Sequence, residues 1–415
     1  MNHWKKWSCA ACQLLKYPCE YLFAYKHIYT LNIAAIMLLI PINAHAYLGL
    51  CCAKCGGNMP MNIMGGGVPE THEFRFKIQP SFMRMQGVQQ GTSNVSSNSL
   101  LGMPMIGGIP TGKFMAVQRN MNMSMLNFAM GYSFSDDFFA GIMPMYQDKR
   151  MDMTFNATMR TTTAQSGYTM QSSGLADTML MSKYRIYTDD PLIPTSEASL
   201  FMGVSLPTGS IDKRNHSHPL AIRQSELLPY GMQLGSGTFD PMLGLLYQGS
   251  SAPWWWGGNG TYTNRFYNNH RGYRLGDIAK IDTYLMHQTN YNFLWQIQAN
   301  LEWKGRIHGR ADEVINGQSG HAIHGNTSSP LMTPLWDSNN YGGFKASTTL
   351  GLQWQPTHLH IIDLSIKLPV YQRFNGIQLK DKFGIMLTWY IEFPTSKSIR
   401  SLSHSHTAAD AALGF

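Results

Sequence analysis

The stretch GIMLTWYIEF at 384–393 decides the fold, because its apolar and polar residues alternate one by one. One face of the strand that it predicts carries Ile385, Leu387, Trp389, Ile391 and Phe393. The opposite face carries Lys382, Gly384, Thr388 and Glu392. Successive side chains of a strand point to opposite faces. This strand is therefore expected to separate an apolar environment from a polar one.

A second alternating stretch, 294–310, is longer than most strands of globular proteins. Its apolar positions are Trp295, Ile297, Ala299, Leu301, Trp303 and Ile307. Its polar positions are Gln296, Gln298, Asn300, Glu302, Lys304, Arg306 and His308. A soluble β-sandwich would place the Trp side chains inward and a membrane barrel would place them outward. Strands of globular proteins usually have about five or six residues, so the length favours the barrel.

Ten more stretches fit the same period, which predicts about twelve strands: 72–85, 114–134, 138–151, 174–188, 197–206, 236–249, 254–267, 277–291, 343–355 and 358–373. Long connections rich in Gly, Ser, Asn and His alternate with connections of two to nine residues. This rhythm is typical of an antiparallel transmembrane β-barrel with long external loops and short periplasmic turns. The sequence therefore predicts an all-β barrel over 72–393 with both chain ends in the periplasm. A large secreted β-sandwich is the alternative.

Composition excludes several other classes. Charged residues make up 13% of the 415 residues, against about a quarter in soluble domains. Hydrophobic residues nevertheless reach 44%, which is too many for a disordered chain. The mean hydropathy of −0.20 argues against many apolar helices, each of which needs about 20 residues to span a membrane.

The sequence near the two ends of the chain predicts a signal peptide, an arm that follows it and a C-terminal tail. Residues 1–46 have the basic start, the short apolar core and the Ala44-His45-Ala46 site of a signal peptide, with a membrane anchor as the alternative. Without the leader, 28 basic and 23 acidic residues leave a net charge of +5, too mild to suggest nucleic acid. The Cys/Gly/Met-rich segment 47–71 is expected to be a periplasmic or plug-like arm, and 394–415 a flexible tail.

Aromatic residues gather near the predicted strand ends, where interface girdles belong. They are Trp254, Trp255, Trp256, Tyr262, Phe266, Tyr267, Trp303, Trp354 and Tyr390. Aromatic core packing is the other interpretation. The strand that ends at Phe393 resembles the C-terminal signal strand of outer-membrane barrels, which implies recognition by the barrel-assembly machinery.

Four short motifs resemble one family of bacterial barrels. They are Gly174-Leu-Ala-Asp177 with Lys183-Tyr-Arg185, Leu206-Pro-Thr-Gly-Ser210, Gln233-Leu-Gly-Ser-Gly237 with Asp240-Pro241, and Arg274 with Gly276-Asp277. Together they are similar to the outer-membrane channel and transporter family of the meta-pathway of phenol degradation, over about 170–280. The resemblance implies an outer-membrane β-barrel that transports small hydrophobic or aromatic compounds. It transfers no catalytic residues.

Charged residues in the polar phase are candidates for the lumen and its selectivity: Arg75, Lys77, Asp177, Lys183, Arg185, Asp240, Glu302, Lys304 and Arg306. A charge that faced lipid would cost about 2–4 kcal/mol at the bilayer midplane, so the lumen is the favourable side. These residues could set solute selectivity, or they could pair into an internal ion-pair layer that fills a narrow barrel. The sequence leaves both roles open.

Methionine recurs in Met-x-Met pairs, which place two thioethers on one face of a strand. Met83 and Met85 share the phase of Arg75 and Lys77, and Met179 and Met181 share the phase of Asp177 and Lys183. Thioethers suit Cu(I), so these four residues are candidate metal ligands, and copper is a possible cofactor where none is otherwise expected. Flexible apolar filling is the alternative. Paired His residues at 216/218, 321/324, 358/360 and 404/406 are metal ligands or solvated loop residues.

Three cysteines follow the predicted cleavage site, at Cys51, Cys52 and Cys55. In an oxidising periplasm they predict one disulfide, for which Cys52 and Cys55 are the candidates, and one odd thiol. They could instead join the soft-metal ligands, or Cys51 could be a lipidated N-terminus.

No enzyme is predicted, since His287 lies on the lipid phase and no nucleophile motif accompanies it. The expected protein is an outer-membrane channel or uptake barrel of a Gram-negative bacterium, in contact with lipid and a small hydrophobic or aromatic solute. A copper-binding or copper-transporting barrel is the second hypothesis, and a structural or adhesive barrel is the third.

Overall fold

The computed structural model describes residues 59–63, 71–190, 194–290, 292–357, 359–398 and 401. The predicted leader, Cys51, Cys52, Cys55 and most of the tail lie outside these residues. No helix in the described part of the chain is long and apolar enough to cross a membrane.

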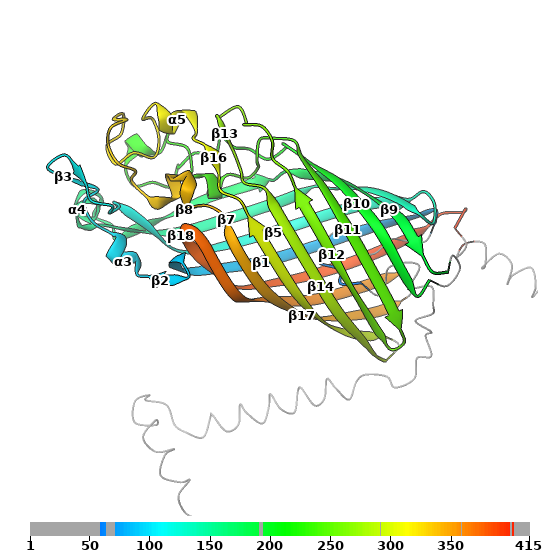
Figure 1. Cartoon of the computed structure of the whole chain (residues 1–415). Coiled ribbons are helices and arrows are strands. Elements are labelled where there is room, and N and C mark those ends of the chain that lie inside the picture. Colours follow the sequence, from blue (N-terminus) through cyan, green and yellow to red (C-terminus); the bar gives the residue numbers. More distant parts are fainter. Residues whose placement is uncertain are drawn as a thin grey trace, which may run out of the picture. The chain divides into compact units, whose positions relative to one another are not determined.

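Antiparallel strands close into a ring (Figure 1). In ring order they are β1 (Glu73–Gly91), β18 (His360–Pro394), β17 (Gly343–Thr357), β15 (Phe293–Lys304), β14 (Ile278–Asn290), β12 (Trp254–Thr263), β11 (Asp240–Ser251), β10 (Ser196–Leu206), β9 (Thr178–Thr188), β6 (Phe138–Met143) and β5 (Ala116–Ser133). Pairing of β1 with β5 completes the ring. Residues 360–374 of β18 pair with β17 and residues 374–394 pair with β1. Because β18 supplies two strands, the described ring has about twelve, and the predicted all-β barrel is confirmed.

Two of the ring's strands continue beyond it as an extended wall. β7 (Met145–Phe155) follows β6 along the same partner, β5. Pro144 separates them because proline has no N–H to donate to the ladder. β8 (Gly167–Leu175) pairs with β7 and precedes β9 in the same way. The predicted strands 138–151 and 174–188 therefore correspond to β6 with β7 and to the end of β8 with β9.

The two faces of the strands have opposite chemistry, as β15 shows. Trp295, Ile297 and Leu301 are exposed on the outside. Gln296 and Gln298, between them, are buried inside. A soluble sandwich would bury the apolar face, whereas a membrane barrel shows it to lipid. The outer surface is therefore that of a transmembrane barrel.

A buried ion pair lies at the seam where the first and last strands meet. Arg75 and Glu392 stand opposite each other in the β1–β18 register and their side chains form an ion pair. After the strand, Thr395 donates a 2.6 Å hydrogen bond to the carbonyl of His72. The first residues of the predicted tail thus pack against the start of β1.

The connections differ at the two ends of the barrel, which we call the loop end and the turn end (Figure 1). At the turn end the connections are short: they join Ser133 to Phe138, Thr188 to Ser196, Ser251 to Trp254, Asn290 to Phe293 and Thr357 to His360. The long connections at the loop end contain β2 (Ser93–Val95), α3 (Ser97–Leu100), β3 (Met105–Ile106), β4 (Ile109–Pro110), α4 (Ala157–Thr163), η1 (Ala221–Arg223), η2 (Tyr230–Met232), β13 (Tyr273–Arg274), β16 (His308–Gly309), α5 (Asp312–Ile315), η3 (Pro334–Trp336) and η4 (Ser338–Asn340).

Some predicted boundaries and faces are wrong. β1 continues to Gly91 instead of ending at 85, and β15 ends at Lys304 instead of 310. Beyond Lys304 the chain leaves the barrel wall, so Arg306 is an exposed loop residue. Trp255 and Tyr390 pack inside the barrel. Each is next to an outward-facing Trp, and a strand turns alternate side chains to opposite faces.

Exposed aromatic residues form two bands on the outer face of the barrel. At the turn end Trp254, Trp295, Trp354 and Trp389 are exposed, and at the loop end Tyr262, Phe266, Tyr267 and Trp303 are exposed. Along β15, Trp295 and Trp303 are eight residues apart, or roughly 26 Å at about 3.3 Å per residue. Strands of membrane barrels tilt by about 35–45°, so this length spans roughly 20 Å of the membrane, which approaches the apolar band of about 25 Å.

Candidate functional site

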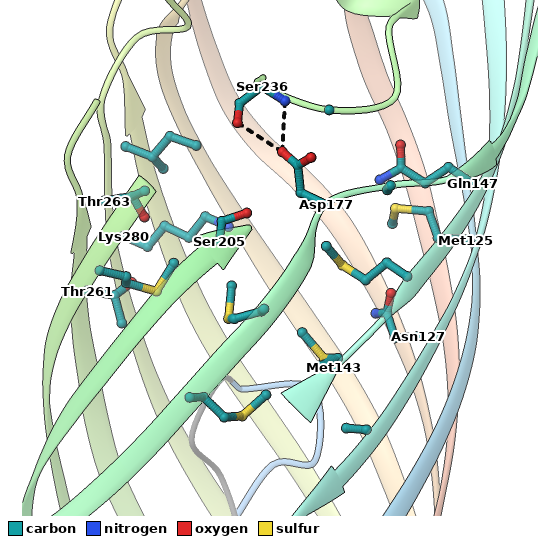
Figure 2. A pocket seen from close by; sticks show the side chains of 18 of the residues that line it. Met125, Asn127, Met143, Gln147, Asp177, Ser205, Ser236, Thr261, Thr263 and Lys280 are labelled. Carbon is teal, nitrogen blue, oxygen red and sulfur yellow. Dashed lines mark hydrogen bonds between the residues drawn. The ribbon is translucent and has the colours of Figure 1, made fainter. Parts of the chain in front are cut away.

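A cavity of about 520 Å³ lies inside the barrel. Its lining includes Asn62 and Ile63 on one side and residues of the loop 207–239 on the other. Figure 2 shows Asp177 and Ser236 at one margin and Met143 further down the wall. The cavity is therefore bounded at the turn end by the N-terminal segment and at the loop end by an inward loop.

The segment 59–63 closes the turn end from within the barrel, and we call it the plug segment. Met59, Met61 and Ile63 are at most 3% exposed. Met59 and Ile63 pack against residues of β11, β14 and β15, and Met61 packs against Ile361 and Tyr390. These contacts place the segment in the interior.

Interior polar side chains bind the plug segment by hydrogen bonds. Gln353 donates to the carbonyl of Met59 at 2.8 Å, and Lys77 donates to the carbonyl of Met61 at 3.0 Å. The amides of Asn62 and Gln298 exchange two hydrogen bonds of 3.0 and 2.7 Å. Lys77, a predicted lumen residue, thus holds the plug segment.

At the loop end, Asp177 anchors the loop 207–239, which we call the inward loop. One carboxylate oxygen accepts from the N–H of Gly209 at 3.0 Å. The other accepts from the N–H and hydroxyl of Ser236 at 2.7 and 2.9 Å (Figure 2). Lys149 adds hydrogen bonds to the carbonyls of Gly231 and Gln233 at 3.2 and 2.6 Å. Both ends of the inward loop are therefore fixed to a buried carboxylate.

Glycine is required where the two ends of the inward loop meet. A Cβ on Gly235 would lie 2.4 Å from a carboxylate oxygen of Asp177 and 2.5 Å from the carbonyl oxygen of Gly209. A Cβ on Gly209 would lie 2.8 Å from the Cα of Gly235. The motifs at 174–177, 206–210 and 233–237 thus converge on one contact that closes the loop end.

Asp240, another predicted lumen residue, anchors the next loop. It accepts a 2.9 Å bond from Arg265, whose own N–H donates to Asp277 at 2.8 Å. Arg265 also donates to the carbonyl of Gly276 at 2.5 Å. The Arg274–Asp277 motif therefore belongs to a loop-holding cluster together with Asp240.

The other predicted charges form separate pairs inside the barrel. Glu197 lies between Lys183 at 3.6 Å and Arg185 at 3.9 Å. Arg185 also pairs with Asp137 in a turn at 2.7 Å. Glu302 pairs with Lys280 at 3.6 Å, while Lys304 lines the cavity. The charges thus form several local clusters and no single layer.

The cavity has two unlike walls. Seven methionines border the cavity, and one of them, Met130, has its side chain exposed on the outer face. The other six line one wall, which we call the methionine wall: Met125, Met143, Met145, Met179, Met181 and Met242. The strands on the other side contribute Asn259, Thr261, Lys280, Asp282 and Lys304. A molecule in the cavity would therefore meet thioethers on one side and polar groups on the other.

Of the predicted soft-metal ligands, the structure brings Met179 and Met181 to the cavity. Met85 packs against the core at the loop end, and neither Met83 nor Met85 lines the cavity. Met143, Met145 and Met242 also line the cavity but are not among the predicted ligands, although Met143-x-Met145 has the same spacing. The plug segment is not predicted either, although its Met59-x-Met61 pair is part of the same pattern.

The histidine pairs do not assemble a metal site in the described part of the chain. No group of three or more His, Cys, Asp or Glu side chains there could hold a metal. His321 contacts the carbonyls of Ser329 and Val314 through its two ring nitrogens at 2.6 and 2.8 Å. His287 lies between Trp254 and Trp295, whose rings are exposed on the outer face.

His218 makes the inward loop sensitive to pH. Its ring is buried against Tyr168, and its Nδ1 accepts from the N–H of Leu220 at 3.1 Å. Burial, followed by the nearby charge of Arg223, lowers the pKa of His218 to about 4. An unfolded loop would take up the proton near pH 6.5. The stability that neutral His218 contributes is therefore present above about pH 6.5 and lost as the pH falls toward 4.

We expect the denaturant midpoint of the purified protein to fall between pH 7.5 and pH 5, and His218→Asn to reduce that fall. Asparagine can keep the acceptor for Leu220 but does not titrate. His216→Asn is the matched control, because His216 is exposed in the same loop. An equal fall in all three proteins would contradict the assignment to His218.

No known family model and no curated protein matches this sequence. Among solved structures, the chain is similar to an outer membrane channel from Pseudomonas putida F1, with 10% identity, a TM-score of 0.48, and coverage of 81% of this chain and 99% of that one. It is also similar to the transport unit of the autotransporter AIDA-I from Escherichia coli, with 9% identity, a TM-score of 0.40 and coverage of 83% and 96%. A third similar structure is the P. putida toluene transporter TodX, with 8% identity, a TM-score of 0.36, and coverage of 79% of this chain and 91% of that one. At such identities and TM-scores, function must be argued from this chain's own residues.

Proposed function

We propose that the protein is an outer-membrane channel for a small, mainly apolar solute. The observation that carries this proposal is the cavity of about 520 Å³ inside a barrel whose outer face is apolar. Sites for small molecules usually enclose about 300–1,000 Å³. A barrel that served only as a structural or adhesive element would not need an internal compartment of this size.

The connections support one orientation in the membrane. Bacterial outer-membrane barrels have short periplasmic turns and longer extracellular loops. The loop end would then face the outside and the turn end, with the plug segment, the periplasm. The strand that ends at Phe393 would be presented to the barrel-assembly machinery in the periplasm.

The lining supports a solute with an apolar body and a polar end. Flexible thioether side chains adapt to apolar shapes, so the methionine wall suits the body. Lys280 and Lys304 on the other side suit a polar or anionic end. Entry would require displacement of the inward loop and exit would require displacement of the plug segment, both of which are held by hydrogen bonds.

Uptake of benzoate as a probe, which has an apolar ring and an anionic end, is measured in cells with and without the protein and tests the proposal. We expect deletion to slow uptake and Met242→Gln to slow it severalfold, because a buried amide without partners costs about 1–3 kcal/mol. Met83→Gln is the matched control, since Met83 is on the inward-facing side of its strand but does not line the cavity. Unchanged uptake on deletion would favour a structural or adhesive barrel and contradict the channel.

A further inference from the structure

Some thioethers of the methionine wall lie closer together than the lining of a solute cavity requires. Met143 on β6 and Met179 on β9 stand directly opposite each other in the strand register. Side chains opposite each other in an antiparallel pair have Cβ atoms about 4.5–5.5 Å apart. Both residues are buried, at 7% and 6% exposure. Their sulfur atoms can therefore approach a common point through side-chain rotation alone.

Met181 has glycine as its register partner on each neighbouring strand, so neither partner places a side chain directly beside it. Gly141 of β6 and Gly203 of β10 are its register partners. On the far side of Gly203 the next register partner is Met242 of β11. The ring of Phe201 covers this row, since it lies 3.4 Å from the position that a Cβ on Gly203 would take. Met242 packs against the same cluster and adds a fourth thioether to the wall.

We propose that the methionine wall binds a soft monovalent cation, Cu(I), through the thioethers of Met143, Met179 and Met181. Thioether sulfur is a soft ligand that favours Cu(I), whereas Zn(II) and Cu(II) favour imidazole and carboxylate. The surroundings of the three residues are apolar, with Ala129 and Phe201 in the same cluster. The residues of this cluster provide no hard ligand. The nearby carboxylate of Asp177 already accepts hydrogen bonds from Gly209 and Ser236.

The cationic residues of the cavity do not prevent this binding. Arg75 pairs with Glu392, Arg265 with Asp240 and Lys280 with Glu302. Lys77, Lys149 and Lys304 also line the cavity, together with the carboxylates of Asp177 and Asp282. Lys77 and Lys149 donate to backbone carbonyls. The six cations of the lining thus stand against five carboxylates, and the interior is largely compensated.

A second group of methionines in the same protein serves as apolar core packing. Met121, Met151 and Met153 pack at the loop end among Val88, Phe155, Leu228 and other apolar residues. None of the three lines the cavity. They have the same side chain and similar burial, and Met121 and Met151 are also register partners. They differ in lying away from the cavity, so they provide a matched control.

The test uses the full-length protein with every cysteine replaced by serine, because thiolates bind the same ions. Silver(I), a redox-stable substitute for Cu(I), is titrated by calorimetry into this protein and into Met143→Leu/Met179→Leu/Met181→Leu. Met-to-Leu changes largely conserve volume and are well tolerated. We expect about one tightly bound ion per barrel, and a loss of at least tenfold in affinity in the triple variant.

The control Met121→Leu/Met151→Leu/Met153→Leu should bind silver as the parent does. X-ray absorption of the Cu(I)-loaded parent should show sulfur neighbours and no nitrogen. Absence of tight binding in the parent, unchanged binding in the cavity variant, or an equal loss in the control would each overturn the proposal. Benzoate uptake is measured separately, so this site and the proposed channel can fail independently.

Discussion

Replacing Asp177 by asparagine is expected to open the cavity at the loop end. Both carboxylate oxygens of Asp177 accept hydrogen bonds, from Gly209 and from Ser236. In asparagine one of these oxygens becomes an NH₂ group, which would face an N–H donor. Loss of these charge-assisted bonds should cost about 3 kcal/mol. The fraction of molecules with a displaced inward loop should then rise by roughly two orders of magnitude.

Thiol labelling in detergent measures this change. Thr261 lines the cavity, so Thr261→Cys in a protein without other cysteines reports whether a small water-soluble reagent can enter. We expect slow labelling in the parent and much faster labelling with Asp177→Asn. Asp148→Asn is the control, because Asp148 pairs with the exposed Arg150 on the outer side of β7. Equal labelling rates for Asp177→Asn and the parent would contradict the anchoring role.

Replacing the plug segment by five Gly and Ser residues is expected to open the cavity at the turn end. Met59, Met61 and Ile63 are buried, and each such side chain contributes roughly 1.5–3 kcal/mol. A Gly/Ser segment keeps the chain length but removes these contacts and the Asn62 hydrogen bonds. The segment should therefore leave the interior, and labelling of Thr261→Cys should again become fast.

The control for this change is a Gly/Ser replacement of 106–110, a surface segment in which Ile106 and Ile109 are 66% and 70% exposed. It should leave the labelling rate of Thr261→Cys unchanged. Slow labelling after loss of the plug segment would mean that these residues do not close the turn end.

The strands could be predicted from the sequence because one face of each strand meets lipid and the other meets the barrel interior, so apolar and polar residues alternate. Trp295, Ile297 and Leu301 show this alternation without knowledge of any contact. The two closures could not be predicted in this way. The bonds from Asp177 to Ser236 and from Asn62 to Gln298 join residues 59 and 236 positions apart, and neither loop sequence has a local pattern that indicates them.

The candidate site was predictable only in part, for the same reason. Alternation places Asp177 and Asp240 on the polar face of the barrel wall but does not show that loop residues are their partners. Arg306 follows the alternation beyond Lys304, although the chain has already left the wall there. Spacing marks Met179 with Met181 and Met143 with Met145, but only the strand register shows that Met143 and Met179 are neighbours.

The central claim, that the cavity is closed independently at both ends, is tested most directly by single-channel conductance in planar bilayers. Access to the cavity needs one open end, but ion flow through the barrel needs both. We therefore predict near-parent conductance for Asp177→Asn and for the plug-segment replacement alone, and a large increase when the two are combined. Full conductance from either change alone, or none from the combination, would contradict the account.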